Sequence, residues 1–143
     1  MPETPKHSVS VAGVVIDEAE RVLLIQRRDN GHWEPPGGVL ELGEGFTEGV
    51  CREVHEETGL TIDVDRLTGV YKNMTRGVVV IVFRCRALDG TIHPTDEAAR
   101  VEWCELSEAL SLMNEAYAVR ISDAYKDTPP TRTHDGVRLT AHT

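Results

Sequence analysis

The stretch GVLELGEGFTEGVCREVHEETGL, residues 38–60, decides the fold of this chain. Its second half has the spacing of an amphipathic helix, because Phe46, Val50 and Val54 recur every four residues and form one apolar stripe. The sequence therefore predicts a helix over 46–58, with the apolar stripe facing a core.

Glycines mark both ends of the expected helix. Gly45 is placed to act as its N-cap, and Gly59 is placed to end it in the left-handed conformation that glycine adopts easily. Gly49 lies inside the helix, where glycine costs about 1 kcal/mol relative to alanine, so we interpret it as a point of close packing.

Three carboxylates crowd one side of this helix. Residues three or four positions apart share a helix face, so Glu53 lies beside both Glu56 and Glu57. Like charges in this arrangement repel, and a divalent cation such as Mg²⁺ would relieve the repulsion. The alternative is a solvated acidic face with Arg52 and His55 as partners.

The same stretch resembles the Nudix box, the signature of the Nudix hydrolases. The signature runs Gly, five residues, Glu, seven residues, then Arg-Glu-aliphatic-any-Glu-Glu-any-Gly-aliphatic. A chance match at a given start has a probability on the order of 10⁻⁹ at ordinary residue usage. Each fixed position is occupied, by Gly38, Glu44, Arg52, Glu53, Val54, Glu56, Glu57, Gly59 and Leu60.

The order of elements fits an α/β (α+β) Nudix fold, a mixed β-sheet sandwiched between helices. Pro35 to Gly38 is expected to form an irregular loop, because prolines and glycines break regular structure. Two helical segments are expected near the C-terminus, one starting at Ser107 and one over 114–125. Strands are expected over 9–16, 22–26, 61–71, 78–88 and 100–106, the first two as a hairpin.

The length of 143 residues suggests one domain, which we place at 1–126. Residues 127–143 form a polar C-terminal tail or arm. The sequence does not choose between a disordered tail, one folded back over the substrate cleft, and one that reaches a partner subunit. It also leaves open whether the chain forms a homodimer.

Composition excludes several function classes. The formal net charge of −9 argues against binding a nucleic acid polymer, which needs a basic surface, although a metal cation can still mediate contact with a small phosphate ligand. The sequence shows no signal peptide and no apolar run long enough for a bilayer, so we expect a cytoplasmic protein without membrane contact. The three cysteines are expected to be reduced.

The resemblance implies a metal-dependent hydrolase that splits the diphosphate bond of a nucleoside diphosphate linked to another group. It implies Glu53 and Glu57 as the principal ligands of Mg²⁺ or Mn²⁺, with Glu56 completing the site directly or through water. The Gly38 carbonyl is a further oxygen ligand in this interpretation.

The resemblance also suggests supporting and catalytic roles. Glu44 and Arg52 look like a pair that braces the loop against the helix. Three acids are candidates for the general base: Glu53, Glu56 and Glu97. We favour Glu97 as an extra metal ligand or base, with Asp96 as the fallback and an exposed loop acid as the alternative.

Two residues outside the box are candidates for substrate binding. Arg27, at the end of the second strand, is placed to meet a phosphate, and a surface arginine is the alternative. Trp33 is a candidate for stacking on a base, although packing under the loop carries more weight. The histidines show no ligand spacing, and we interpret them as ordinary polar residues.

The substrate is expected to be a nucleoside triphosphate, cleaved by pyrophosphohydrolysis. An ADP-ribose or sugar-nucleotide pyrophosphatase is the first alternative, although the proline typical of the ADP-ribose type is missing between Leu60 and Pro94. A non-catalytic Nudix-fold nucleotide sensor is the second, and the intact set of box carboxylates disfavours it. An enzyme acting on RNA ends is disfavoured by the acidic charge.

Overall fold

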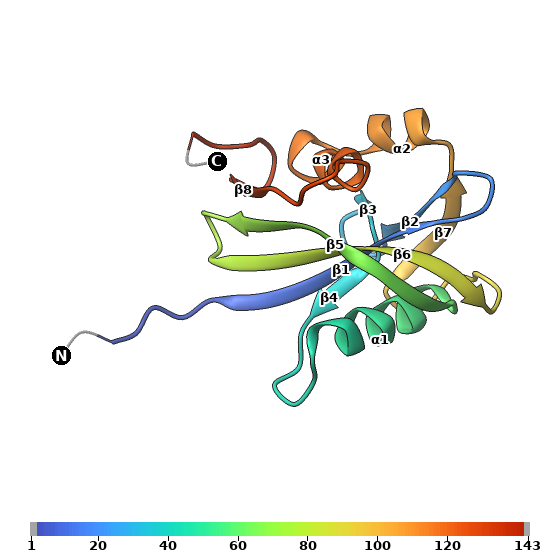
Figure 1. Cartoon of the computed structure of the whole chain (residues 1–143), viewed down its shortest axis with the longest axis horizontal. Helices are drawn as coiled ribbons and strands as arrows, with labels where there is room; N and C mark the ends of the chain where they lie inside the picture. Colours follow the sequence, from blue (N-terminus) through green and yellow to red (C-terminus); the bar gives the residue numbers. More distant parts are fainter. Residues whose placement is uncertain (1–2, 142–143) are drawn as a thin grey trace.

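The computed structural model describes residues 3–141 and shows a twisted mixed sheet between helices (Figure 1). Helix α1 covers one face of the sheet, and α2 and α3 cover the other. The helices are α1 (Phe46–Thr58), α2 (Leu106–Leu112) and α3 (Glu115–Asp123). The strands are β1 (Ser8–Ile16), β2 (Val22–Arg27), β3 (Trp33–Glu34), β4 (Gly37–Val39), β5 (Thr61–Asn73), β6 (Val78–Asp89), β7 (Ala98–Cys104) and β8 (Thr131–His134).

Strand β1 lies at the centre of the sheet. It pairs in parallel with β6 and antiparallel with β2 and β4. The sheet runs in the order β3-β2-β1-β6-β5-β8, and β7 pairs with β2 outside this path. Among residues 3–141, no helix is both long enough and apolar enough to cross a membrane.

The core consists of two apolar layers on opposite faces of the sheet. Because side chains alternate along a strand, Val11 and Val15 of β1 pack with α1, while Val14 packs on the side of α3. Val50 and Val54 are fully buried against the first layer, but Phe46 is 51% exposed. The apolar stripe predicted for α1 is therefore correct for two of its three residues, and Phe46 lies at the exposed first position.

The predicted elements are found close to their expected positions, with one correction. Helix α1 has the predicted bounds, Gly45 is its N-cap, and Gly59 ends it at φ 87°. The expectation of a wholly irregular loop over 35–38 is wrong, because Gly37–Val39 forms β4 against β1. A Cβ at Gly37 would lie 2.3 Å from the Val11 carbonyl oxygen, so the absence of a side chain permits this pairing.

The chain beyond α3 folds back onto the sheet. Strand β8 pairs in parallel with β5, with Asn73 opposite His134, and thereby extends the sheet at its edge. Residues 131–134 thus form a paired strand, an arrangement that was not among those left open from the sequence. It places His134, 1% exposed, beneath α3.

Candidate functional site

Two glutamates of α1 meet the glycines of β4. Glu53 and Glu57 are 8% and 5% exposed, and such burial is unusual for acids. The Gly37 N–H donates to Glu57 Oε1 at 2.7 Å. A Cβ at Gly38 would come within 2.5 Å of the Glu53 carboxylate, so this side chain packs directly on the glycine backbone.

The pairing of β4 with β1 decides which peptide groups face α1. Two backbone bonds mark alternate rungs of the ladder, from Gly13 N to the Pro36 carbonyl and from Leu40 N to the Val9 carbonyl. Hydrogen-bonded pairs alternate in an antiparallel ladder, so Gly38 belongs to a bonded pair with Val11, and the peptide groups of Gly37 point away from β1. This geometry favours the Gly37 carbonyl over that of Gly38 as an oxygen facing the carboxylates.

Arg52 ties the acids of this region together. Its guanidinium donates two hydrogen bonds to Glu44, from Nε at 2.9 Å and from Nη2 at 2.6 Å. Its Nη1 donates to Glu53 at 3.0 Å and to Glu56 at 3.2 Å, and its Nη2 also donates to the Val39 carbonyl. One planar cation therefore connects the loop after β4 with two carboxylates of α1.

The electrostatics of the acids differ according to their partners. The hydrogen bonds from Arg52 lower the pKa of Glu44 to about 2. Burial raises the pKa of Glu57 to about 8, and the nearby charges of Glu53, Glu34 and Glu97 add to this effect. Burial also raises the pKa of Glu53, against the opposing effect of Arg52. Glu57 is thus an acid that lacks a compensating cation.

The donor set fits a hard divalent cation that keeps part of its water shell. In the described part of the chain, no three His, Cys, Asp or Glu side chains form a closed ligand cluster. Mg²⁺ rarely uses such a cage, because it binds through one or two carboxylates together with waters and substrate phosphates. Glu53 and Glu57 supply buried, partly uncompensated oxygens, and Glu56 lies exposed at the rim.

The raised pKa of Glu57 predicts that its charge lowers the free energy of unfolding of the metal-free protein, to a degree that depends on pH. The folded state favours the neutral acid, so this loss is absent below about pH 4.5 and grows as pH rises toward 8. We expect the free energy of unfolding of Glu57→Gln to exceed that of the parent protein by an amount that grows to roughly 2–5 kcal/mol across this pH range. Urea unfolding in chelator from pH 5 to 8.5 measures the difference, and a constant difference across this range contradicts the assignment.

Two acidic residues, Asp96 and Glu97, precede β7. Glu97 is exposed, and it is near enough for its charge to raise the pKa of both Glu53 and Glu57. Its backbone carbonyl accepts a hydrogen bond from Arg28 N, which fixes the start of β7 beside β2. Asp96 is also exposed.

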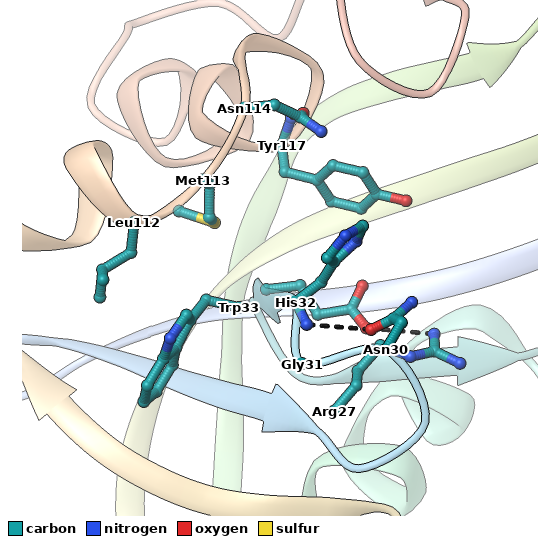
Figure 2. Close-up of a pocket in the computed structure, with 10 residues that line it drawn as sticks. Arg27, Asn30, Gly31, His32, Trp33, Leu112, Met113, Asn114 and Tyr117 are labelled. Atoms are coloured by element: carbon teal, nitrogen blue, oxygen red, sulfur yellow. Dashed lines mark hydrogen bonds and ion pairs between the residues drawn. The ribbon is translucent and has the colours of Figure 1, made fainter.

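Arg27 and Trp33 line a neighbouring cavity of about 250 Å³ between β2, β3 and the start of α3 (Figure 2). The Arg27 guanidinium is already paired with Asp29 at 2.7 Å and with Glu34 at 3.2 Å. Trp33 packs partly buried on the core under α3, beneath the guanidinium of Arg100. Figure 2 shows the Tyr117 ring pointing from α3 toward the loop between β2 and β3.

The structure reveals three polar residues near the site that the sequence did not single out. Glu34 is half-buried, and burial raises its pKa. Arg120 is a buried residue of α3 and His134 is buried on β8, and both line a cleft that Gly37 and Gly38 also line. The expectation that every histidine is an ordinary polar residue is therefore wrong for His134. Arg120 lies four residues after the apolar Ala116, so the two share a helix face, and this spacing was the one sequence signal that Arg120 would be buried.

Comparison with known proteins gives a consistent family assignment. A family model described as NUDIX domain matches residues 6–125. A Streptomyces ambofaciens protein named MutT-like protein is 53% identical over 136 residues, which cover 94% of this chain and 88% of that protein. A Methanocaldococcus jannaschii protein named ADP-ribose pyrophosphatase is 37% identical over 107 residues, which cover 70% of this chain and 63% of that protein.

Solved structures share the fold. A NUDIX hydrolase from Nitrosomonas europaea superposes with a TM-score of 0.78 at 21% identity, over 92% of this chain and 82% of that one. A MutT protein from Methanosarcina mazei Go1 superposes with a TM-score of 0.72 at 27% identity, over 85% of this chain and 94% of that one. The mixed sheet with helices on both faces is the architecture common to these proteins and this chain.

Proposed function

Because this chain belongs to the Nudix family of pyrophosphohydrolases, we propose that it cleaves a diphosphate bond of nucleoside triphosphates with the help of Mg²⁺ or Mn²⁺. The observation that carries the proposal is the pair of buried acids, Glu53 and Glu57, packed against Gly37 and Gly38 beside a cleft. Nudix hydrolases act on small nucleotides and generally need a divalent metal ion.

In this proposal Glu53 and Glu57 hold the metal ion, and Glu56 completes the site directly or through water. When bound, the ion neutralises phosphate charge and lowers the pKa of a water molecule. The Gly37 N–H fixes one oxygen of Glu57, so the other oxygen is directed toward the site. Arg52 orients Glu53 and Glu56 while its bidentate contact with Glu44 keeps its own position.

A group outside the helix completes the proposed chemistry. Glu97 is exposed and lies close to the buried acids, which suits a residue that takes a proton from the attacking water or contributes a further ligand oxygen. Glu53 and Glu56 are the other candidates for the base. Arg27 and Trp33 border the cavity next to the cleft, where a phosphate or a base of the substrate would lie.

A second candidate substrate is ADP-ribose or a sugar nucleotide. The 37% identity to a protein named ADP-ribose pyrophosphatase supports it. The acids of α1 suit both candidates at the diphosphate, because each candidate presents phosphate oxygens to the same acids. The two differ in what lies on either side of that bond, so activity measurements separate them.

The experiment is a substrate panel of nucleoside triphosphates, oxidised nucleotides, ADP-ribose and sugar nucleotides, each with Mg²⁺, Mn²⁺ or chelator. We expect metal-dependent release of pyrophosphate and a nucleoside monophosphate from triphosphates, at least tenfold faster than turnover of ADP-ribose. A preference for ADP-ribose or a sugar nucleotide overturns the proposed substrate. The absence of both turnover and metal binding would support a non-catalytic nucleotide sensor.

A further inference from the structure

A cleft of about 290 Å³ runs beneath α3 and β8 and reaches the glycines of β4. This volume is close to the lower end of the range for small-molecule sites. Its lining combines glycine backbone with charged and hydrogen-bonding side chains, including Glu34, Gly37, Gly38, Tyr117, Arg120 and His134. The cleft therefore connects the buried acids of α1 with polar groups from the other side of the sheet.

Two residues that line this cleft each have a buried nitrogen atom without a hydrogen-bond partner. Among residues 3–141, the buried side-chain nitrogen and oxygen atoms without a hydrogen-bond partner are Arg120 Nε and His134 Nε2. Leaving a polar group buried and unpaired costs about 1–3 kcal/mol, so such groups are rare unless something else satisfies them. Both unpaired groups belong to residues that line one cleft, which indicates a ligand with hydrogen-bond acceptors.

His134 presents a neutral donor to the cleft. Its Nδ1 accepts a hydrogen bond from the Gly136 N–H at 3.0 Å, so the proton of the neutral ring lies on Nε2. Burial and the nearby charge of Arg120 lower the pKa of His134 and favour this neutral form. The unpaired atom is therefore an N–H group that seeks an acceptor.

Arg120 presents a positioned guanidinium. The side chain is 5% exposed, and its guanidinium carbon lies 4.4 Å from the centre of the Tyr117 ring and 5.3 Å from that of Tyr71. These aromatic faces hold the cation without using its N–H groups. The donors of Arg120 thus remain available in a fixed plane, the arrangement that suits two adjacent acceptors.

Glu34 supplies the complementary acceptor and balances the charge. It lines the same cleft, and it is close enough for its charge and that of Arg120 to shift the pKa of each other. The buried floor of the cleft then holds one cation, one acid and one neutral donor, whereas Arg27, which pairs with Glu34, and Arg76 line its exposed rim. The three groups of the floor together carry little net charge, so the floor suits a neutral group bearing both a carbonyl and an N–H better than it suits a phosphate.

We propose that Arg120, His134 and Glu34 recognise the lactam edge of an oxo base, in which a ring N–H stands next to a carbonyl. The carbonyl accepts from Arg120 and His134, and the ring N–H donates to Glu34. Hypoxanthine, guanine and uracil carry this edge, whereas adenine presents an amino donor that faces the donors of the cleft. The proposal rests on the nucleotide substrate proposed above and adds a preference among bases.

The test compares the binding of IMP and AMP, which differ at this edge of the base alone. Isothermal titration calorimetry in chelator measures binding without turnover. We expect IMP to bind the parent protein about 5–100-fold more tightly than AMP, the range set by one good pair of base contacts. Arg120→Met and His134→Phe are each expected to bring the ratio of the two affinities to within twofold of one, chiefly by weakening the binding of IMP.

Controls keep this test decisive. Arg86→Met removes an exposed arginine that pairs with Asp63 on the sheet, and it should keep the full preference for IMP. Circular dichroism identifies variants that fail to fold, and Glu34→Gln then provides a further variant, expected to lose at least fivefold of the preference. Equal binding of IMP and AMP by the parent protein overturns the inference. Competition by inorganic phosphate that disappears in Arg120→Met also overturns it, in favour of an anion site.

The outcome is separable from that of the substrate panel. A preference for IMP in a protein that hydrolyses no triphosphate supports the base site and refutes the proposed reaction. Hydrolysis of triphosphates without any preference for IMP refutes the base site and leaves the proposed reaction intact.

Discussion

Replacing Glu57 by glutamine is expected to reduce metal-dependent turnover by about 10³-fold, because the proposed site loses an anionic ligand that stabilises the transition state by roughly 4 kcal/mol. The substitution keeps the shape of the side chain and an oxygen that can accept from the Gly37 N–H. Steady-state kinetics with the best substrate of the panel measures the effect.

The fold should survive this substitution. Glu57 is buried without a compensating cation, so the neutral glutamine removes an unfavourable charge from the metal-free protein. The matched control is Glu48→Gln on the exposed side of the same helix, which should keep full turnover. Turnover of Glu57→Gln within threefold of the parent protein would show that this carboxylate does not act in the reaction.

Replacing Asp123 by asparagine is expected to cost about 3–5 kcal/mol of the free energy of unfolding, as for a buried ion pair that loses one partner. Asp123 is fully buried and accepts hydrogen bonds from Tyr71 at 2.7 Å and from Arg132 at 2.8 and 2.9 Å. An amide at this position would turn an N–H group toward one of these donors. Urea unfolding at pH 7 measures the loss.

The interactions of Asp123 join three elements, since Tyr71 lies on β5 and Arg132 on β8. Hydrogen bonds from Arg132 and Tyr71 lower the pKa of Asp123 against the effect of burial, so this stabilisation is present above its ordinary pKa of 3.8 and is lost as pH falls below it. Tyr71→Phe is the milder comparison and should cost about 1 kcal/mol. An Asp123→Asn protein as stable as Tyr71→Phe contradicts this account.

The contact between Asp123 and Arg132 also affects the cleft beneath α3. Arg132 stands two residues before His134 on β8, and the parallel pairing with β5 sets the register of both. Loosening the contact with Asp123 is therefore expected to disturb the position of the His134 donor as well as the edge of the sheet. Structure far from the buried acids thus contributes to the shape of the proposed base site.

The sequence predicted the parts of the fold that depend on local patterns. Helix α1 followed from its apolar spacing and from Gly45 and Gly59, which have local effects on the backbone. The pairing of β1 with β2 followed from two apolar runs separated by a short turn. Strand β4 was missed because its pairing depends on β1, twenty-five or more residues away along the chain, rather than on its own residues.

The same difference between local patterns and long-range contacts explains which parts of the candidate site the sequence predicted. The carboxylates of α1 lie within one helical turn of each other, so their proximity was visible from spacing alone. Arg120 and His134 come from α3 and β8 and meet only when β8 folds back beside β5. No spacing along the chain predicts that Arg120 and His134 lie close together. His134 is an isolated histidine in a polar segment, so the sequence gave no reason to expect its burial.

The central claim, that Glu53 and Glu57 bind a divalent ion, is tested most directly by titrating Mn²⁺ into the protein and following free Mn²⁺ by electron paramagnetic resonance. We expect the parent protein and Glu48→Gln to bind Mn²⁺ with the same affinity, and Glu57→Gln to bind at least about tenfold more weakly, a loss of roughly 1.4 kcal/mol. Equal affinity of all three proteins for Mn²⁺ would contradict the claim.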